Sequence, residues 1–221
     1  MSIVDQYGSP YRYQSKFAHG ADRSPSSGPQ FPNVLDDISS LVPRHDRMTL
    51  QSLSRRLYTN FGVLKAAVDQ KADYSVGHAW QACFRSPDVA GANAAREWTA
   101  DNFFPLCDIR GGVFDWSETL SLISQGIDRD GEAYVLLTES AGKEPRIQTI
   151  PAHRIGQRNY SEKIVESGPY SGMRLCDGVI LNPVGRAVAY RVLGDNKEGK
   201  DDQDISARDM IHVFEPKFSE Q

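Results

Sequence analysis

The spacing of apolar residues predicts helices in the first half of the chain. The longest stripe repeats at helical intervals and consists of Leu50, Leu53, Leu57, Phe61, Leu64 and Val68. Asp46 or Thr49 is positioned to cap its start, and Asn60-Phe61-Gly62 is expected to divide it, with Asn60 capping the second helix. We expect this stripe to be buried against the strands, so that Leu57→Ala would cost about 2–5 kcal/mol.

Three further elements are predicted before residue 130. Trp80 to Phe84 alternates as a short strand does, and it follows Gly77, which suits a helix end. Ala92 to Phe103 has helical spacing. Asp115 and Glu118 have the spacing of a capping box. The helix that they begin carries an apolar stripe and is expected to end before Asp128; the stripe is Trp116, Leu120, Ile123 and Ile127.

After residue 130 the apolar period becomes that of strands. Two hairpins are predicted, one from 133–137 and 146–150, the other from 178–181 and 187–192. Residues 194–204 are expected to form a solvated loop, Ser206 to cap one helical turn, and Ile211 to Phe214 to form a last strand. Helices followed by strands predict an α+β fold, with N-terminal helices packed on a mixed, mostly antiparallel β region.

Composition divides the chain into three segments. Residues 1–45 are predicted to be a flexible arm, since Ser24-Pro25-Ser26-Ser27-Gly28-Pro29 has little to bury; its aromatic residues leave open a docking arm instead of a simple tail. Residues 46–130 are expected to form a helical part and residues 131–221 a β-rich part.

The net charge, the apolar runs and the cysteine content limit the kinds of function that this chain is expected to have. The 221 residues carry a formal net charge of −4, which argues against a surface that grips nucleic acid by neutralising phosphates. No apolar run is long enough to cross a bilayer, and the first residues lack the pattern of a secretory signal. Cys83, Cys107 and Cys176 are widely spaced, which favours reduced packing thiols in a cytosolic compartment.

The sequence offers weak candidates for catalysis or metal binding, and we predict no catalytic, cofactor-binding or metal-binding residues. Gly111-Gly112 lacks the Lys-Ser/Thr of a phosphate loop and is expected to be a turn. The histidines lack metal-ligand spacing, and His212 is expected to be half-buried in its strand; the histidines are His19, His45, His78, His153 and His212. Cys107 beside Asp108 is better explained by packing than as a nucleophile.

The densest group of carboxylates is Asp128, Asp130 and Glu132. Their alternate spacing is compatible with a divalent cation, but Asp130-Gly131 is also a turn signal, and we favour the turn. Glu132 enters an apolar strand and needs a cationic partner if it is buried, for which Arg146 is the candidate.

The order of several short motifs resembles the lambda-type portal proteins of tailed bacteriophages over about residues 47–221. These motifs are Arg55-Arg56-Leu57-Tyr58-Thr59-Asn60, Asp130-Gly131-Glu132-Ala133-Tyr134, Ile147 to Ile155, Gly185-Arg186-Ala187-Val188-Ala189-Tyr190 and Ile205 to His212. The chain departs from the pattern at Phe61, where the family often has Asn or Pro.

The resemblance implies a structural subunit of a homo-oligomeric ring, a dodecamer in the family. The ring lies at one vertex of the virion head, and double-stranded DNA is packaged and ejected through it. The expected partners are other portal subunits, the major capsid or scaffold protein, terminase and the head–tail adaptor, with no cofactor and no membrane. The expected location is the virion, and the host cytoplasm during assembly.

The resemblance assigns this segment to the outer wing of the subunit. The Arg-Gly turn and the channel-lining stem helices that follow in the family are expected beyond Gln221, together with the contacts to terminase and adaptor. We therefore expect rings to form poorly from this chain alone. One alternative is a stand-alone interaction domain or prophage remnant that binds portal subunits. The other is an α+β hydrolase that uses Asp108, His153 or His212.

Overall fold

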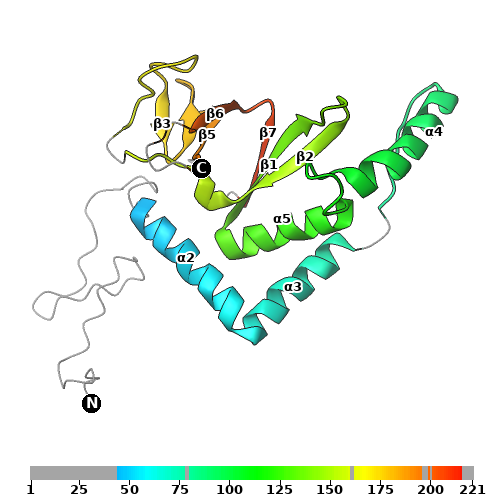
Figure 1. Ribbon diagram of the computed structural model, residues 1–221, viewed down its shortest axis with the longest axis horizontal. Helices are drawn as coiled ribbons and strands as arrows, with labels where there is room; N and C mark the ends of the chain where they lie inside the picture. The colour runs from blue at the N-terminus through cyan, green and yellow to red at the C-terminus, as the bar shows by residue number, and fades with distance from the viewer. Residues whose placement is uncertain (1–43, 78–79, 160–161, 196–198, 200, 216–221) are drawn as a thin grey trace, which may run out of the picture.

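The computed structural model describes residues 44–77, 80–159, 162–195, 199 and 201–215. Within these residues the chain has an α+β fold, as the sequence predicts: the helices precede the strands (Figure 1). The described α-helices are α2 (Arg44–Asn60), α3 (Gly62–Val76), α4 (Val89–Trp98) and α5 (Trp116–Asp130). None of the described helices is both long enough and apolar enough to span a membrane.

Both ends of helix α5 are determined by residues next to them in the sequence. Asp115 accepts a hydrogen bond from the Glu118 amide at 2.8 Å, and the Glu118 carboxylate accepts one from the Asp115 amide at 3.0 Å. The predicted capping box is therefore confirmed. Gly131 ends the helix with φ 86°, a conformation that glycine adopts without steric cost, so that α5 extends to Asp130 and not to Ile127.

Loss of this cap should destabilise the protein. We expect Asp115→Ala to lower the free energy of unfolding by about 0.5–2 kcal/mol, since the Glu118 amide loses its side-chain acceptor. Asp115→Ser keeps an acceptor oxygen and is expected to cost much less. Urea denaturation of both variants tests this, and equal losses would show that the cap contributes little.

The strands form two antiparallel sheets. The first has the order β2-β1-β7, from β1 (Glu132–Glu139), β2 (Pro145–Ile150) and β7 (Met210–Phe214). The second has the order β3-β4-β5-β6, from β3 (Arg174–Cys176), β4 (Val179–Leu181), β5 (Ala187–Val192) and β6 (Gln203–Ser206). Both predicted hairpins, β1–β2 and β4–β5, are confirmed.

Side chains along β1 point alternately into two apolar clusters, one on each face of the sheet. Val135 faces α5 and packs with Cys107 and Ile147 beside Trp116 and Ile123. Tyr134 faces the other way, into a cluster that joins the two sheets and contains Ile150, Ala152, Ile155, Tyr190 and Met210. The three-stranded sheet is thus covered by α5 on one face, and by the second sheet near β7 (Figure 1).

The outer edge of β2 is paired with the segment before α5. The Ile147 amide donates to the Cys107 carbonyl at 2.7 Å, and the Ile109 amide donates to the Ile147 carbonyl at 3.0 Å. Pro145, at the start of β2, has no amide hydrogen to offer there.

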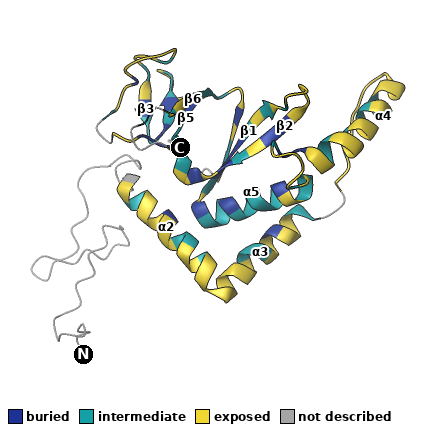
Figure 2. Cartoon of the chain, viewed as in Figure 1, coloured by how far each residue is buried: buried dark blue, intermediate teal, exposed yellow. Residues whose placement is uncertain are grey.

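The expected burial of the long apolar stripe is wrong. Leu57 is 45% exposed, and Leu50, Leu53 and Phe61 are exposed as well (Figure 2). The opposite, polar side of α2 faces the body of the protein, where its arginines neutralise two buried carboxylates. Leaving those carboxylates unpaired would cost several kcal/mol, which outweighs the exposure of leucines. Leu57→Ala is accordingly expected to change stability little in an isolated chain.

Helix α4 projects away from both sheets (Figure 1). Asp88 caps it by accepting from the Gly91 amide at 3.1 Å, so that the helix begins before the predicted Ala92. It continues through a π-helical turn, Thr99–Phe103, and a 3-10 turn, Phe104–Leu106. None of the α4 residues is buried.

Four local predictions need correction. Helix α2 begins at Arg44, before either proposed cap. Asn60 does not cap α3, because its side chain donates to the Arg56 carbonyl, although the break at Phe61 is confirmed. Residues 80–84 form no strand, since Trp80 and Phe84 are exposed and find no neighbouring strand. Ser206 ends β6 and is followed by a turn instead of a helix.

Some predictions fall outside the described residues. Except for Arg44 and His45, which begin α2, the expected arm at 1–45 lies there, and so do His19 and His78 and part of the 194–204 loop.

Candidate functional site

Two carboxylates at the junction of α5 and β1 hold helix α2 in place. Asp130, the last residue of α5, has a side chain only 2% exposed. The Arg55 guanidinium donates to both of its oxygens, at 2.7 and 2.9 Å. Arg129 donates to the same carboxylate from Nη2 at 3.0 Å and from Nε at 3.3 Å. The side-chain amide of Gln51 donates to the Asp130 carbonyl at 3.1 Å. This carboxylate thereby fixes the middle of α2 to the end of α5.

Glu132, at the start of β1, holds the beginning of α2. Arg47 Nη1 and the Tyr134 hydroxyl each donate to it at 2.9 Å, and His212 Nε2 lies 3.2 Å from its second oxygen. Arg47 Nε also forms an ion pair with Asp177 at 2.8 Å, in the β3–β4 turn. One arginine of α2 therefore joins both sheets to the helical layer.

Both carboxyl groups are held in the charged form. Burial by itself would raise the pKa of Asp130, but the hydrogen bonds from Arg55 and Arg129 outweigh it and lower that pKa. Burial likewise opposes ionisation of Glu132, and the contacts with His212, Arg47 and Tyr134 lower its pKa overall. The Tyr134 pKa is raised by burial and by the neighbouring Glu132 charge, so that this hydroxyl remains a donor.

These pKa shifts predict a loss of stability in acid. Both pKa values fall below the ordinary values of 3.8 and 4.5 for Asp and Glu, so their stabilising contribution is complete above about pH 4.5. It is lost as the pH falls through the lower, folded-state values. We expect the free energy of unfolding, measured in urea, to be smaller at about pH 3 than at about pH 6. The double variant Asp130→Asn/Glu132→Gln should show a weaker pH dependence; an unchanged one would refute this assignment.

Arg146 is not the partner of Glu132, contrary to the sequence-based expectation. The register of the hairpin places Arg146 opposite Thr138, about 20 Å along β1 from Glu132. Its guanidinium instead donates to Glu144 at 2.5 Å. The actual partner, Arg47, is 85 positions away in the sequence.

The carboxylates considered as metal ligands are separated by their cationic partners. Asp128 is paired with Lys71 at 2.5 Å, Asp130 with Arg55 and Arg129, and Glu132 with Arg47. Within the described part of the chain, no group of three His, Cys, Asp or Glu residues is arranged to hold a metal ion. The three charges serve as separate attachment points for α2, α3 and α5.

The residues considered for hydrolysis lie in different clusters. Cys107 is fully buried, with its sulfur near the Thr119 hydroxyl at 3.6 Å, and burial raises the pKa of its thiol. Asp108 is paired with Arg110, His153 lies against Arg55, and His212 stacks on Tyr134 at 4.3 Å between ring centres. None of these contacts joins a nucleophile to a base.

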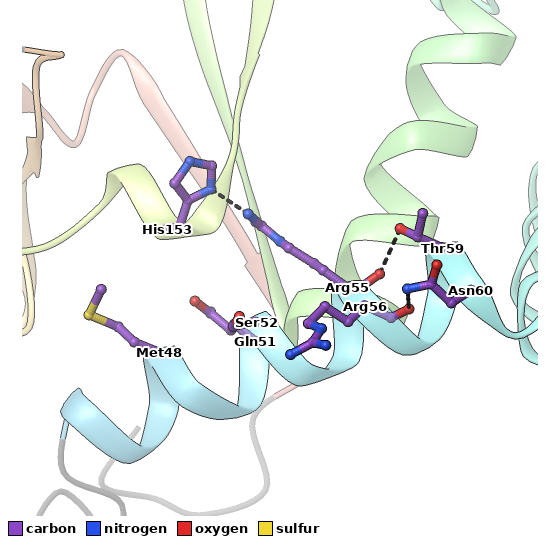
Figure 3. A pocket seen from close by; sticks show the side chains of 8 residues that line it. All are labelled: Met48, Gln51, Ser52, Arg55, Arg56, Thr59, Asn60 and His153. Carbon is purple, nitrogen blue, oxygen red and sulfur yellow. Dashed lines mark hydrogen bonds between the residues drawn. The ribbon is translucent and has the colours of Figure 1, made fainter.

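An open pocket of about 440 Å³ lies between α2 and the 3-10 turn η3 (Ala152–Arg154) (Figure 3). Arg55 crosses it, with Nη1 2.6 Å from His153 Nδ1, while Arg56 and Asn60 lie at its rim. Burial and the Arg55 charge lower the pKa of His153, so that the neutral ring accepts this hydrogen bond. In this pocket the Arg55 guanidinium is therefore already engaged, while that of Arg56 has no partner among the described residues.

Comparison with known families identifies the chain. The family described as "Phage portal protein, lambda family" matches residues 34–221. The chain belongs to this family. A search of curated proteins gives no match.

The site described above consists of contacts that hold parts of the fold together, which agrees with membership of a structural family. The family is structural, and its members are components of the virion head that act in DNA packaging. In this portal chain the family-like motif at 55–60 places Arg55 on Asp130, and the motif at 130–134 supplies Asp130, Glu132 and Tyr134. The two motifs meet in space and attach α2 to the body.

The residues on the α2 side of this contact are not predicted as partners by the sequence. Arg47, Gln51 and Arg55 are spaced four apart and therefore lie on one face of α2. This polar stripe was a signal that one side of α2 meets charged groups, but its partners lie more than seventy residues away.

Proposed function

We propose that this chain forms the outer, wing-like part of a portal subunit at one vertex of the virion head. The observation that carries the proposal is the family match over residues 34–221. It is supported by an α+β body in which α2 is fixed through buried ion pairs while its apolar side remains exposed. A subunit that completes its packing against neighbours has this distribution of apolar surface.

The proposed role is structural and needs no cofactor. The subunits assemble into a ring through which double-stranded DNA enters and leaves the head, and they contact the capsid or scaffold protein. Terminase and the head–tail adaptor engage the same ring through other parts of the subunit. Assembly takes place in the host cytoplasm, and the finished ring resides in the virion.

Immunogold electron microscopy of virions tests the location. Antibodies against this chain, applied to phage particles that encode it, are expected to label a single vertex, the one that bears the tail. Deleting the coding sequence should leave heads without DNA, and supplying the protein from a plasmid should restore filled heads. Label spread over the whole head, or normal filling after deletion, would contradict the proposal.

A further inference from the structure

Two apolar surfaces of this chain lack a partner within the described residues. The first, which we call the α2 face, consists of Leu50, Leu53, Leu57, Phe61 and Leu64. The second, which we call the α4 arm, is the segment Val89–Phe103, with Val89 67% exposed and Trp98 exposed as well. The α2 face is a continuous apolar stripe, which soluble monomers rarely expose without an interaction to cover it. On α4, Val89 and Trp98 lie nine positions apart and therefore on opposite sides of the helix, so the apolar centre of the arm is Trp98.

The charges beside the two surfaces are opposite in sign. Arg56 adjoins the α2 face, is exposed, and its guanidinium has no partner among the described residues. The α4 arm carries Glu97 and Asp101, which are also exposed and unpaired within the described part of the chain. The one arginine on the arm, Arg96, is turned to Asn93 at 3.0 Å. Opposite charges around apolar centres are typical of surfaces that bind each other.

The two surfaces lie at opposite ends of the molecule (Figure 1), so that the arm is far from the α2 face of its own chain. Contact between two different surfaces of identical copies is head-to-tail, and it generates a ring when the rotation closes. We propose that the α4 arm of one copy docks on the α2 face of the next. Trp98 is the central anchor, and Glu97 and Asp101 lie toward the arginine-bearing side of α2. This inference rests on the proposed portal function and specifies the surfaces that assembly uses.

A mixing experiment tests this pairing. In the arm variant, Trp98→Glu, the arm carries a charge at its proposed anchor and the α2 face is intact. In the face variant, Leu53→Glu/Leu57→Glu, the α2 face carries the charges and the arm is intact. Each variant alone is expected to associate at least about tenfold more weakly than the wild type, because a carboxylate in an apolar contact is left unpaired. Mixed in equal amounts, the two should form a 1:1 complex of two 24.6 kDa chains that grows no further, detected by native mass spectrometry.

Two controls guard against unfolding as the cause. Val184→Glu places the same charge at a residue 88% exposed in the β4–β5 turn and should leave association unchanged. Trp98→Ala adds no charge and should weaken association in the same direction, with an unchanged circular dichroism spectrum.

The outcomes separate this inference from the proposed function. If the arm variant associates as the wild type does, or if the mixture forms no complex, the pairing is wrong. If both variants form rings as the wild type does, the portal proposal stands and only the choice of surfaces is wrong. A wild type that remains monomeric at every concentration would contradict the pairing, while the portal proposal would still be decided by the labelling of virions.

Discussion

Asp130→Ala is expected to lower the free energy of unfolding by about 3–5 kcal/mol. The substitution removes a carboxylate that receives two hydrogen bonds from Arg55 and further ones from Arg129. Both guanidinium groups would remain partly buried without their counter-ion, and the attachment of α2 to α5 would be lost. The small gain from removing a negative charge at a helix C-terminus does not offset this.

Asp128→Ala is the matched control. It lies two positions earlier in the same helix and removes the same side chain, but its partner Lys71 is 64% exposed. Such a pair contributes at most about 1 kcal/mol. Urea denaturation of both variants should show the difference, and a double-mutant cycle with Arg55→Ala isolates the pairwise energy. Equal losses at the two positions would show that burial of the Asp130 pair is energetically unimportant.

Tyr134→Ala is expected to cost about 3–5 kcal/mol, because it opens a cavity in the cluster that joins the two sheets. The ring is 1% exposed, stacks on His212 and meets Tyr190 edge-on at 5.7 Å. Its hydroxyl is also one of the three donors near Glu132. Loss of the ring therefore affects both packing and the charged contact to α2.

Two further variants separate these contributions. Tyr134→Phe keeps the ring and removes only the hydrogen bond, for an expected loss of about 0.5–1.5 kcal/mol. Tyr74→Ala removes a tyrosine that is 81% exposed, and it should change stability by less than about 0.5 kcal/mol. Thermal unfolding should show the largest loss of stability for Tyr134→Ala, a smaller one for Tyr134→Phe and the smallest for Tyr74→Ala. Any other order would refute the assignment of Tyr134 to the centre of the fold.

The elements that the sequence predicts correctly are those determined by neighbouring residues. The capping box of Asp115 and Glu118 and the turns of both hairpins involve residues a few positions apart. The family membership could also be predicted, because it depends on the order of motifs along the chain.

The orientation of α2 could not be predicted from its own residues. Its apolar stripe satisfies the usual rule for a buried face, yet the helix turns the other side inward. The deciding partners, Asp130 and Glu132, were singled out by their spacing, but the arginines that bind them come from a segment 75 to 85 positions earlier. A helix with two candidate faces is oriented by such distant contacts.

The pairing of β2 with the segment before α5 has a consequence for solubility. An open strand edge is a template on which further chains add, and aggregation through such edges is a hazard for small sheets. Here Cys107 and Ile109 occupy the hydrogen-bonding groups of Ile147, and Pro145 withholds a donor from the same strand. Growth of cross-β aggregates from this side of the sheet is thereby obstructed, so chains awaiting assembly at high concentration are kept from adding to one another there.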